Sequence, residues 1–254
     1  MNKNKTFCIA NWKMNLNQSD SSSFLEKFTA KKTKHNLDNV DVVICPSYPS
    51  LSICSIYLST KTFFLGAQNV YHENKGSFTG EVSVDMLETL DCSFVIVGHS
   101  ERRLLLNENN EIVKKKFDSI YNSSMTPILC IGESIEDRKD KNYENVLKNQ
   151  ITSILDSYTC INKDIIIAYE PVWAIGTGES ASEEIIENTH LIIKNIIKKY
   201  MVKNCNIWLL YGGSVNENNC ENIISLNNVD GFLIGTSSLD PSHFFNIYKK
   251  LGGK

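Results

Sequence analysis

The sequence predicts an α/β fold in which eight parallel strands, each followed by outer helices, close into a single (β/α)8 barrel. Short apolar runs alternate with longer amphipathic segments along the whole chain, which is typical of a parallel sheet covered by helices. The length of 254 residues is near that of such a barrel. Because no linker, low-complexity segment or change in composition divides the chain, we expect residues 1–254 to form one domain.

The short apolar runs predict eight strands, which begin near Thr6, Val40, Thr62, Phe94, Thr126, Ile165, Asn206 and Val229. The longer segments between them predict helices over residues 19–34, 107–122, 143–158, 182–200 and 216–226. The clearest helix is Glu183 to Tyr200, where isoleucine and leucine recur at helical spacing. It follows Ser182, a residue type that caps helix N-termini.

An open, doubly wound sheet is the alternative architecture. That fold favours a glycine-rich dinucleotide fingerprint after its first strand. Here the first strand ends in Asn11-Trp12-Lys13 instead, so the closed barrel remains the prediction.

Charge and hydropathy exclude two classes of partner. The net charge of -3 and the pI near 6.0 provide no basic surface of the kind that nucleic acid requires. No apolar run approaches the about 18 residues needed to span a bilayer, and the residues before Thr6 are too few and too polar for a signal peptide. We therefore expect neither nucleic acid nor membrane as a partner.

The cysteines and histidines point to a reduced protein without a structural metal. The eight cysteines are scattered without a C-x-x-C pair, and several lie in strand-like runs, so we expect reduced core thiols. A reducing compartment follows, with the cytoplasm as the default. The five histidines show neither H-x-x-x-H spacing nor a neighbouring cysteine pair, so we expect no bound metal.

The segment from Ala168 to Gly178 carries the first candidate catalytic group. The apolar run before it predicts a buried strand that ends at Glu170, and barrels place their chemistry at the C-terminal ends of strands. Pro171 restricts the backbone of Glu170 to extended conformations. The apolar and glycine residues that follow, Trp173, Ile175 and Gly176-Thr177-Gly178, predict a lid that excludes water.

Other strand ends add polar groups to the same mouth of the barrel. The first ends at Asn11, with Lys13 two residues on, and the fourth is followed by His99. Ser100 to Arg103 can begin a short helix, whose N-terminal dipole disfavours imidazolium and leaves His99 a neutral hydrogen-bond donor. The seventh and eighth strands end in Gly212-Gly213-Ser214 and Gly235-Thr236, which predicts a phosphate site of backbone N–H groups.

These motifs, in order along the chain, are Asn11-Trp12-Lys13-Met14-Asn15, Gln68-Asn69, Gly76-Ser77-Phe78-Thr79-Gly80-Glu81, Gly98-His99-Ser100-Glu101-Arg102-Arg103, Cys130-Ile131-Gly132-Glu133, the segment from Ala168 to Gly178, Tyr211-Gly212-Gly213-Ser214-Val215 and Asp230-Gly231-Phe232-Leu233. With them, the chain resembles the triosephosphate isomerase family over essentially its whole length. The resemblance implies a TIM barrel that interconverts glyceraldehyde 3-phosphate and dihydroxyacetone phosphate, without a cofactor.

The resemblance also implies a role for each matching residue. Glu170 would be the base, His99 the neutral electrophile and Lys13 the cation that holds the anionic substrate. Asn11 would donate a hydrogen bond to the reacting oxygen, and Glu101 would support Lys13. The substrate-binding residues that the resemblance implies are Asn11, Lys13, Gly176, Ser214, Leu233, Gly235 and Thr236.

Family members are usually dimers, so the resemblance implies a homodimer formed through the loop from Gly76 to Glu81, with Thr79 reaching across. Tyr211 and Ser214 would fasten the closed lid. Two departures from the family pattern bear on function. Thr236 replaces a common glycine, although its N–H survives, and Glu179 adds negative charge at the end of the lid.

Two other functions are possible for a phosphate-binding barrel. Another phosphate-binding sugar-phosphate isomerase would share the phosphate end of the barrel, but we would not expect it to share the other motifs. A catalytically inactive barrel that acts as a scaffold or binds a phosphate ligand would be indicated by loss of Lys13, His99 or Glu170. All three are present.

Overall fold

A computed structural model describes residues 5–158, 161–174, 180–200 and 205–253. Eight strands pair in parallel in sequence order, and the eighth pairs with the first to close the barrel. The strands are β1 (Thr6–Asn11), β2 (Val40–Cys45), β3 (Phe64–Ala67), β4 (Cys92–Val97), β5 (Thr126–Ile131), β6 (Ile165–Tyr169), β7 (Ile207–Tyr211) and β8 (Gly231–Ile234). The predicted closed (β/α)8 TIM barrel is therefore confirmed.

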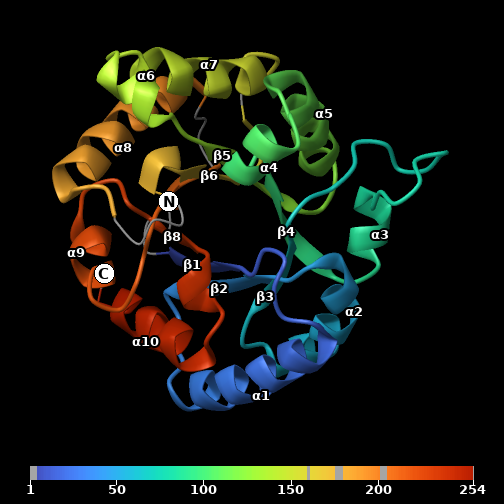
Figure 1. Ribbon diagram of the computed structural model, residues 1–254. Helices are drawn as coiled ribbons and strands as arrows, with labels where there is room; N and C mark the ends of the chain where they lie inside the picture. Colours follow the sequence, from blue (N-terminus) through green and yellow to red (C-terminus); the bar gives the residue numbers. More distant parts are fainter. Residues whose placement is uncertain (1–4, 159–160, 175–179, 201–204, 254) are drawn as a thin grey trace.

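Helices surround the barrel in chain order, so that the chain returns to its starting point (Figure 1). They are α1 (Gln18–Lys34), α2 (Tyr48–Ile56), α3 (Val84–Glu88), α4 (Ser100–Leu105), α5 (Asn110–Tyr121), α6 (Ile135–Lys139), α7 (Tyr143–Leu155), α8 (Glu183–Ile197), α9 (Cys220–Ser225) and α10 (Pro241–Leu251). Short 3-10 turns are η1 (Tyr57–Thr60), η2 (Val172–Ala174), η3 (Lys198–Tyr200) and η4 (Thr236–Ser238). The Ser182 hydroxyl accepts from the N–H of Ile185 and caps α8, as its sequence predicts.

Three strands begin two residues away from the sequence-based expectation, and β7 begins one residue after it, at Ile207. β4 starts at Cys92, two residues before Phe94, because Cys92 already pairs with Leu65 of β3. β3 and β8 start two residues later than predicted, since their first printed strand pairs are Phe64 with Val43 of β2 and Gly231 with Phe7 of β1. Burial selects residues for the core, but only strand pairing decides where a strand begins.

The side chains of each strand alternate between two apolar layers. Phe7 and Ile9 of β1 point into the barrel with residues such as Ile128 and Leu210, whereas Cys8 and Ala10 belong to the layer between the barrel and its helices. The interior is therefore a packed core, which leaves the ends of the strands as the place for chemistry.

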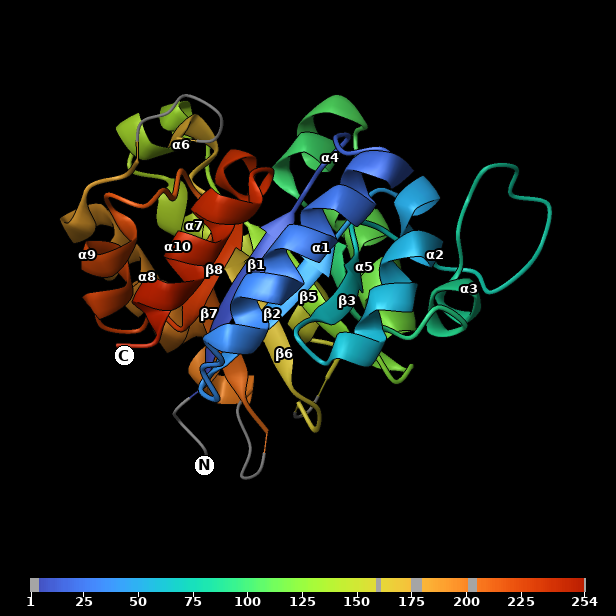
Figure 2. The same cartoon turned by 90° about the horizontal axis from the view of Figure 1, so that it is seen from below.

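The loop between β3 and α3, residues 68–83, is the one part of the described chain that extends clearly away from the barrel (Figures 1 and 2). It is closed at its base by the N–H of Tyr71, which donates to the carbonyl of Val82 at 2.8 Å. Among the described residues, no helix is both long and apolar enough to cross a bilayer.

Candidate active site

Glu170 follows β6 and is 1% exposed. Its backbone N–H donates to the carbonyl of Ile131 at 2.7 Å, and its carboxylate Oε2 accepts from the N–H of Ser100 at 2.9 Å. A Cβ added to Gly212 would lie 3.0 Å from Glu170 Cγ, so a glycine is needed there to leave room for the side chain. The neighbouring strand ends thus hold a buried carboxylate at the mouth of the barrel.

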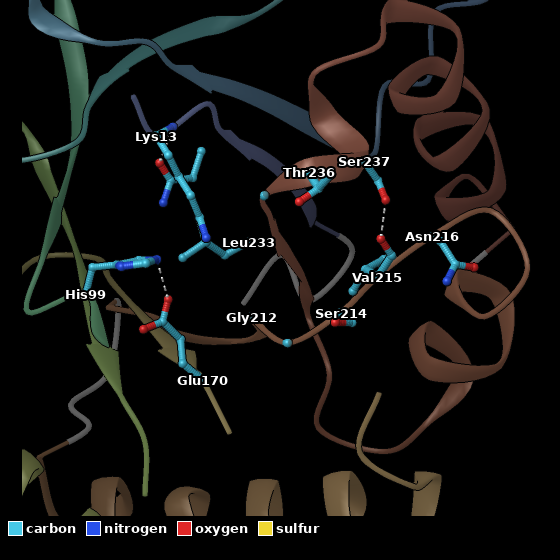
Figure 3. Close-up of a pocket in the computed structure, with 13 residues that line it drawn as sticks. Lys13, His99, Glu170, Gly212, Ser214, Val215, Asn216, Leu233, Thr236 and Ser237 are labelled. Atoms are coloured by element: carbon cyan, nitrogen blue, oxygen red, sulfur yellow. Dashed lines mark hydrogen bonds and ion pairs between the residues drawn. The ribbon is translucent and has the colours of Figure 1, made fainter. Parts of the chain in front are cut away.

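His99 lies between β4 and α4, where it is the N-cap residue of the helix. Its Nδ1 accepts from the N–H of Glu101 at 3.2 Å, and a nitrogen that accepts a hydrogen bond carries a lone pair and no proton. Nε2 therefore bears the proton, and it lies 3.1 Å from Glu170 Oε1 (Figure 3). The Nε2–H of His99 therefore faces the buried carboxylate of Glu170.

Lys13 sits in the turn after β1 with a left-handed φ of 52°. Its N–H donates to Asn11 Oδ1 at 3.1 Å, and its carbonyl accepts from Gln68 Nε2 at 2.8 Å. The ammonium Nζ lies 2.6 Å from Glu101 Oε1. These contacts hold the strained turn in place and keep the ammonium group of Lys13 beside the Glu101 carboxylate.

A pocket of about 290 Å³ brings most of the candidate residues together (Figure 3). Asn11, Lys13, His99 and Glu170 form one part of its wall, and Ser214, Leu233, Gly235 and Thr236 form another. Glu101 does not line the pocket, but its carboxylate pairs with Lys13, which does. Gly176 and Glu179 lie outside the described residues. Within the described parts of the chain, no cluster of three or more His, Cys, Asp or Glu side chains is placed to hold a metal ion.

The pocket also has lining residues that sequence reasoning did not single out, among them Asn216 and Ser237. Ser237 Oγ donates to the carbonyl of Val215 at 2.7 Å, which ties the loop after β7 to the turn after β8. Asn216 and Ser237 could have been predicted from the sequence, because they follow directly after the two glycine-containing strand ends. Polar residues in such positions stabilise the loops that form the mouth.

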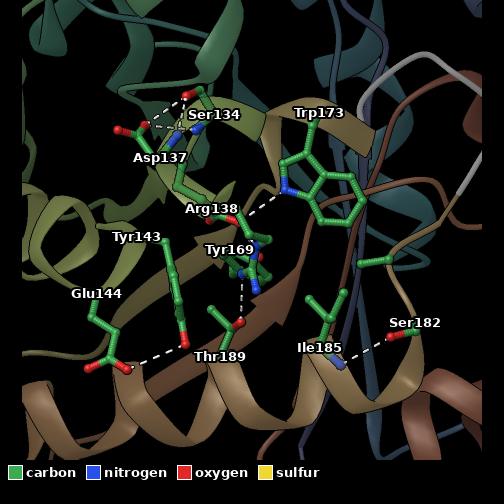
Figure 4. Close-up of polar contacts among 12 residues, drawn as sticks. Ser134, Asp137, Arg138, Tyr143, Glu144, Tyr169, Trp173, Ser182, Ile185 and Thr189 are labelled. Atoms are coloured by element: carbon green, nitrogen blue, oxygen red, sulfur yellow. Dashed lines mark hydrogen bonds and ion pairs between the residues drawn. The ribbon is translucent and has the colours of Figure 1, made fainter. Parts of the chain in front are cut away.

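Glu133 anchors the segment that leads toward the predicted lid. It is buried, and its Oε1 accepts from Arg138 Nε at 2.8 Å, from the Tyr169 hydroxyl at 3.0 Å and from Trp173 Nε1 at 3.1 Å. Arg138 also donates to the Thr189 hydroxyl at 3.1 Å (Figure 4). Since charge-assisted hydrogen bonds are stronger than neutral ones, this network fixes Trp173 and the start of η2.

The chain on either side of residues 175–179 contacts the strand-seven loop. Ser214 Oγ donates to the carbonyl of Ala174 at 2.9 Å, and the Tyr211 hydroxyl accepts from the N–H of Ala181 at 3.1 Å. Burial raises the pKa of Tyr211 to about 12, so the hydroxyl remains protonated. Tyr211 and Ser214 therefore hold the two segments that border the predicted lid.

Comparison with known proteins shows to which family the chain belongs. The family model described as triosephosphate isomerase matches residues 6–251. A triosephosphate isomerase of Dictyostelium discoideum is 40% identical over 254 residues, with 98% of this chain and 97% of that protein covered. The enzyme of Colwellia psychrerythraea is 41% identical, with 96% and 97% covered, and that of Dictyoglomus thermophilum is 40% identical, with 94% and 97% covered. With its closed barrel and the grouped polar residues at the strand ends, the chain belongs to the triosephosphate isomerase family.

Proposed function

We propose that the pocket interconverts glyceraldehyde 3-phosphate and dihydroxyacetone phosphate, with Glu170 as the base. The observation that carries this proposal is the 3.1 Å approach of His99 Nε2 to the buried Glu170 carboxylate, beside the cation Lys13 in one pocket. A carboxylate and a neutral imidazole are the two groups needed to move a proton between adjacent carbons and to stabilise the oxygen between them.

In this mechanism Glu170 removes a proton from the carbon next to the substrate carbonyl, and the electron pair moves onto the carbonyl oxygen to form an enediolate. The Nε2–H of His99 donates a hydrogen bond to that oxygen, and Asn11 and Lys13 contact the same region. The proton of the neighbouring hydroxyl group passes to the former carbonyl oxygen, and Glu170 returns the first proton to the former carbonyl carbon, so that the neighbouring oxygen becomes the new carbonyl oxygen. A neutral imidazole suits this role because it stabilises the oxyanion without first losing a proton to Glu170.

The phosphate group would bind opposite the base, at the N–H groups of Ser214, Gly235 and Thr236, with Leu233 beneath it and Gly176 closing over it. Support comes from the position of Gly235 and η4, since N–H groups at the start of a helical turn favour anions. An enediolate that carries a neighbouring phosphate can eliminate it, so exclusion of water by the lid protects the product.

The direct test is turnover of the purified protein on glyceraldehyde 3-phosphate, with dihydroxyacetone phosphate detected by a coupled dehydrogenase. We expect rapid conversion. A folded protein that binds a phosphate-bearing analogue but gives no conversion would favour the alternative, an inactive scaffold or binding protein. The presence of Lys13, His99 and Glu170 in one pocket speaks for the enzyme.

We expect Thr236→Gly to change the affinity for a phosphate-bearing analogue by less than about threefold, or about 0.7 kcal/mol. Thr236 begins η4 and is not among the described residues with left-handed φ, so glycine has no strain to relieve, and the N–H is present in both proteins. Isothermal titration of wild type and variant checks this. A large gain in affinity would show that threonine strains the phosphate site.

We also propose that the protein is a homodimer formed through the loop from Gly76 to Glu81. Phe78 in this loop packs on Tyr71 at a ring distance of 4.6 Å, yet is 39% exposed. Met14, beside Lys13, is 96% exposed. Large apolar side chains exposed to this extent suit a surface that a second copy covers.

Met14→Glu should convert the dimer to a monomer at micromolar concentration, because it places a charge in the proposed interface. Sedimentation velocity measures the oligomeric state. Leu191→Glu is the matched control, since Leu191 on α8 is also a large exposed residue, at 48%, but lies far from the loop (Figure 1). A wild-type protein that sediments as a monomer at all concentrations would contradict the dimer.

We infer that residues 1–254 form one domain, which the closure of β8 onto β1 supports. We also place the protein in the cytoplasm, a proposal supported by buried thiols such as those of Cys8, Cys45 and Cys130. Fractionation of cells that express the tagged protein tests the location.

A further inference from the structure

A second cavity, of about 170 Å³, also has Glu170 in its wall. It lies among α4, the loop after β5 and α7, and its charged lining residues are Arg103, Asp137 and Glu170. Arg103 is the only cation among the described residues that line it. The cavity therefore places one guanidinium in a shared space with the carboxylate of the proposed base.

Among the described residues, the hydrogen-bond acceptors of Arg103 are all neutral. Its Nε donates to the carbonyl of Gly98 at 2.7 Å, Nη1 to Asn110 Oδ1 at 2.7 Å and Nη2 to the carbonyl of Cys130 at 3.4 Å. In contrast, the neighbouring Arg102 forms an ion pair with Glu108 at 2.7 Å. Within the described parts of the chain, no carboxylate forms an ion pair with Arg103. The positive charge of its guanidinium is therefore not neutralised by a neighbouring side chain.

The two backbone carbonyls that accept from Arg103 lie at the ends of the neighbouring strands β4 and β5. Gly98 is directly before His99, and Cys130 is in β5 next to the strand that delivers Glu170. One guanidinium thus joins the end of β4 to the end of β5. The planar guanidinium, with its fixed arrangement of N–H donors, holds two carbonyl groups at a set distance better than the ammonium group of a lysine can.

We propose that Arg103 is a positioning residue for the reaction: it joins the strand ends beside His99 and Glu170, and its unpaired charge favours the ionised carboxylate of Glu170 across the shared cavity. This inference rests on the proposed role of Glu170 as the base. Charges interact more strongly in a partly buried site than in water, because the effective dielectric constant is lower.

The other charged or titratable groups around Glu170 do not replace this effect. His99 is the neutral donor described above, and Lys13 is paired with Glu101. Burial, and then the Glu170 carboxylate, raise the pKa of Cys130 well above its ordinary range, so that the thiol is uncharged. Asp137, whose Oδ2 accepts from the N–H and hydroxyl of Ser134 at 3.0 and 2.9 Å, carries a charge that opposes ionisation of Glu170.

The pKa of Arg103 agrees with this arrangement. Burial lowers it, while Cys130, the Glu170 carboxylate and Glu108 act in the opposite direction. The Arg103 guanidinium and the Glu170 carboxylate therefore attract each other across the cavity. An arginine remains protonated even when burial lowers its pKa.

Three variants separate the charge of Arg103 from its hydrogen bonds. Arg103→Met removes both, and Arg103→Lys keeps the charge but not the planar donors. Asn110→Asp keeps the guanidinium and places a carboxylate where Asn110 Oδ1 now lies, 2.7 Å from Nη1. Since Asn110 is the first residue of α5, where acidic residues are favourable, this variant is expected to fold.

The measurement is kcat/KM for glyceraldehyde 3-phosphate over about pH 5 to 9, where the acid limb reports the ionisation of the essential base. We expect the midpoint of that limb to move to higher pH by roughly half a unit or more in Arg103→Met and Asn110→Asp. In Arg103→Lys, kcat should fall while the midpoint stays. The substrate phosphate also titrates, but it does so in the same way with every variant. Lys115→Met removes an exposed positive charge on α5 and shows how far a change in net charge alone moves the midpoint.

Asn110→Asp decides the proposal even if Arg103→Met does not fold. An unchanged midpoint in folded, active Asn110→Asp would overturn it, as would equal shifts in Lys115→Met. Failure of the proposed function is distinguishable, because the wild type would then give no conversion or Glu170→Gln would retain full turnover.

Discussion

Glu170→Gln should lower kcat by about 10²–10⁴-fold while the affinity for a phosphate-bearing analogue stays nearly unchanged. Glutamine has the shape of glutamate, and its amide oxygen can still accept from the N–H of Ser100, so the buried side chain keeps its place. The amide cannot accept the substrate proton. The proposed phosphate contacts at the ends of β7 and β8 do not involve this residue and should persist.

Steady-state turnover and isothermal titration of the same protein preparation measure the two effects. Glu187→Gln is a suitable control, because Glu187 lies on α8 and its exposed carboxylate accepts only from Asn227 among its described hydrogen bonds. The control should turn over like the wild type. Near-normal turnover in Glu170→Gln would refute the assignment of the base and, with it, the mechanism.

Lys13→Met should lower kcat/KM by about 10²–10³-fold or more and also weaken binding of the analogue. Lys13 provides the positive charge of the main pocket, and its loss leaves the Glu101 carboxylate, now 2.6 Å from Nζ, without that partner. A negative charge then faces an anionic substrate. Methionine has about the length of the aliphatic part of lysine and is subject to the same left-handed φ of 52°, so the backbone strain does not change.

A double variant separates the two parts of this effect. In Lys13→Met with Glu101→Gln the leftover carboxylate is removed, so we expect part of the analogue affinity to return while kcat stays low. Titration calorimetry and turnover measurements give both quantities. Full activity in Lys13→Met would show that the ammonium only supports the turn after β1, and would remove it from the proposed mechanism.

Much of the fold was predictable because the signals are local. The apolar runs that form β1, β2, β5 and β6 start where the sequence indicates, and Ser182 caps α8 through a contact three residues away. Helix α10 was not predicted, although it carries a local signal. Asp240 accepts from the N–H groups of Ser242 and His243, and Pro241 stands at the first helical position, both of which are typical of a helix start.

The types of residue in the candidate site were also predictable, since each follows a strand and all strands of a parallel barrel end at one mouth. Asn11, Lys13, His99 and Glu170 were expected there, and the structure brings them into one pocket. The role of Glu133 was not predictable. Its partner Trp173 is 40 residues away, and no local pattern indicates that pairing.

The amino-acid sequence is enough to place the strands in order, to locate the polar residues at the strand ends and to identify the family. The protonated nitrogen of His99 and the pairing of Lys13 with Glu101, 88 residues away, follow only from the folded chain. The same is true of Arg103, beside which no carboxylate lies within the described residues. The forces involved differ in range. Hydrophobic periodicity and capping act over a few residues, whereas hydrogen-bond partners, burial and charge pairing depend on which distant segments the closed barrel places side by side.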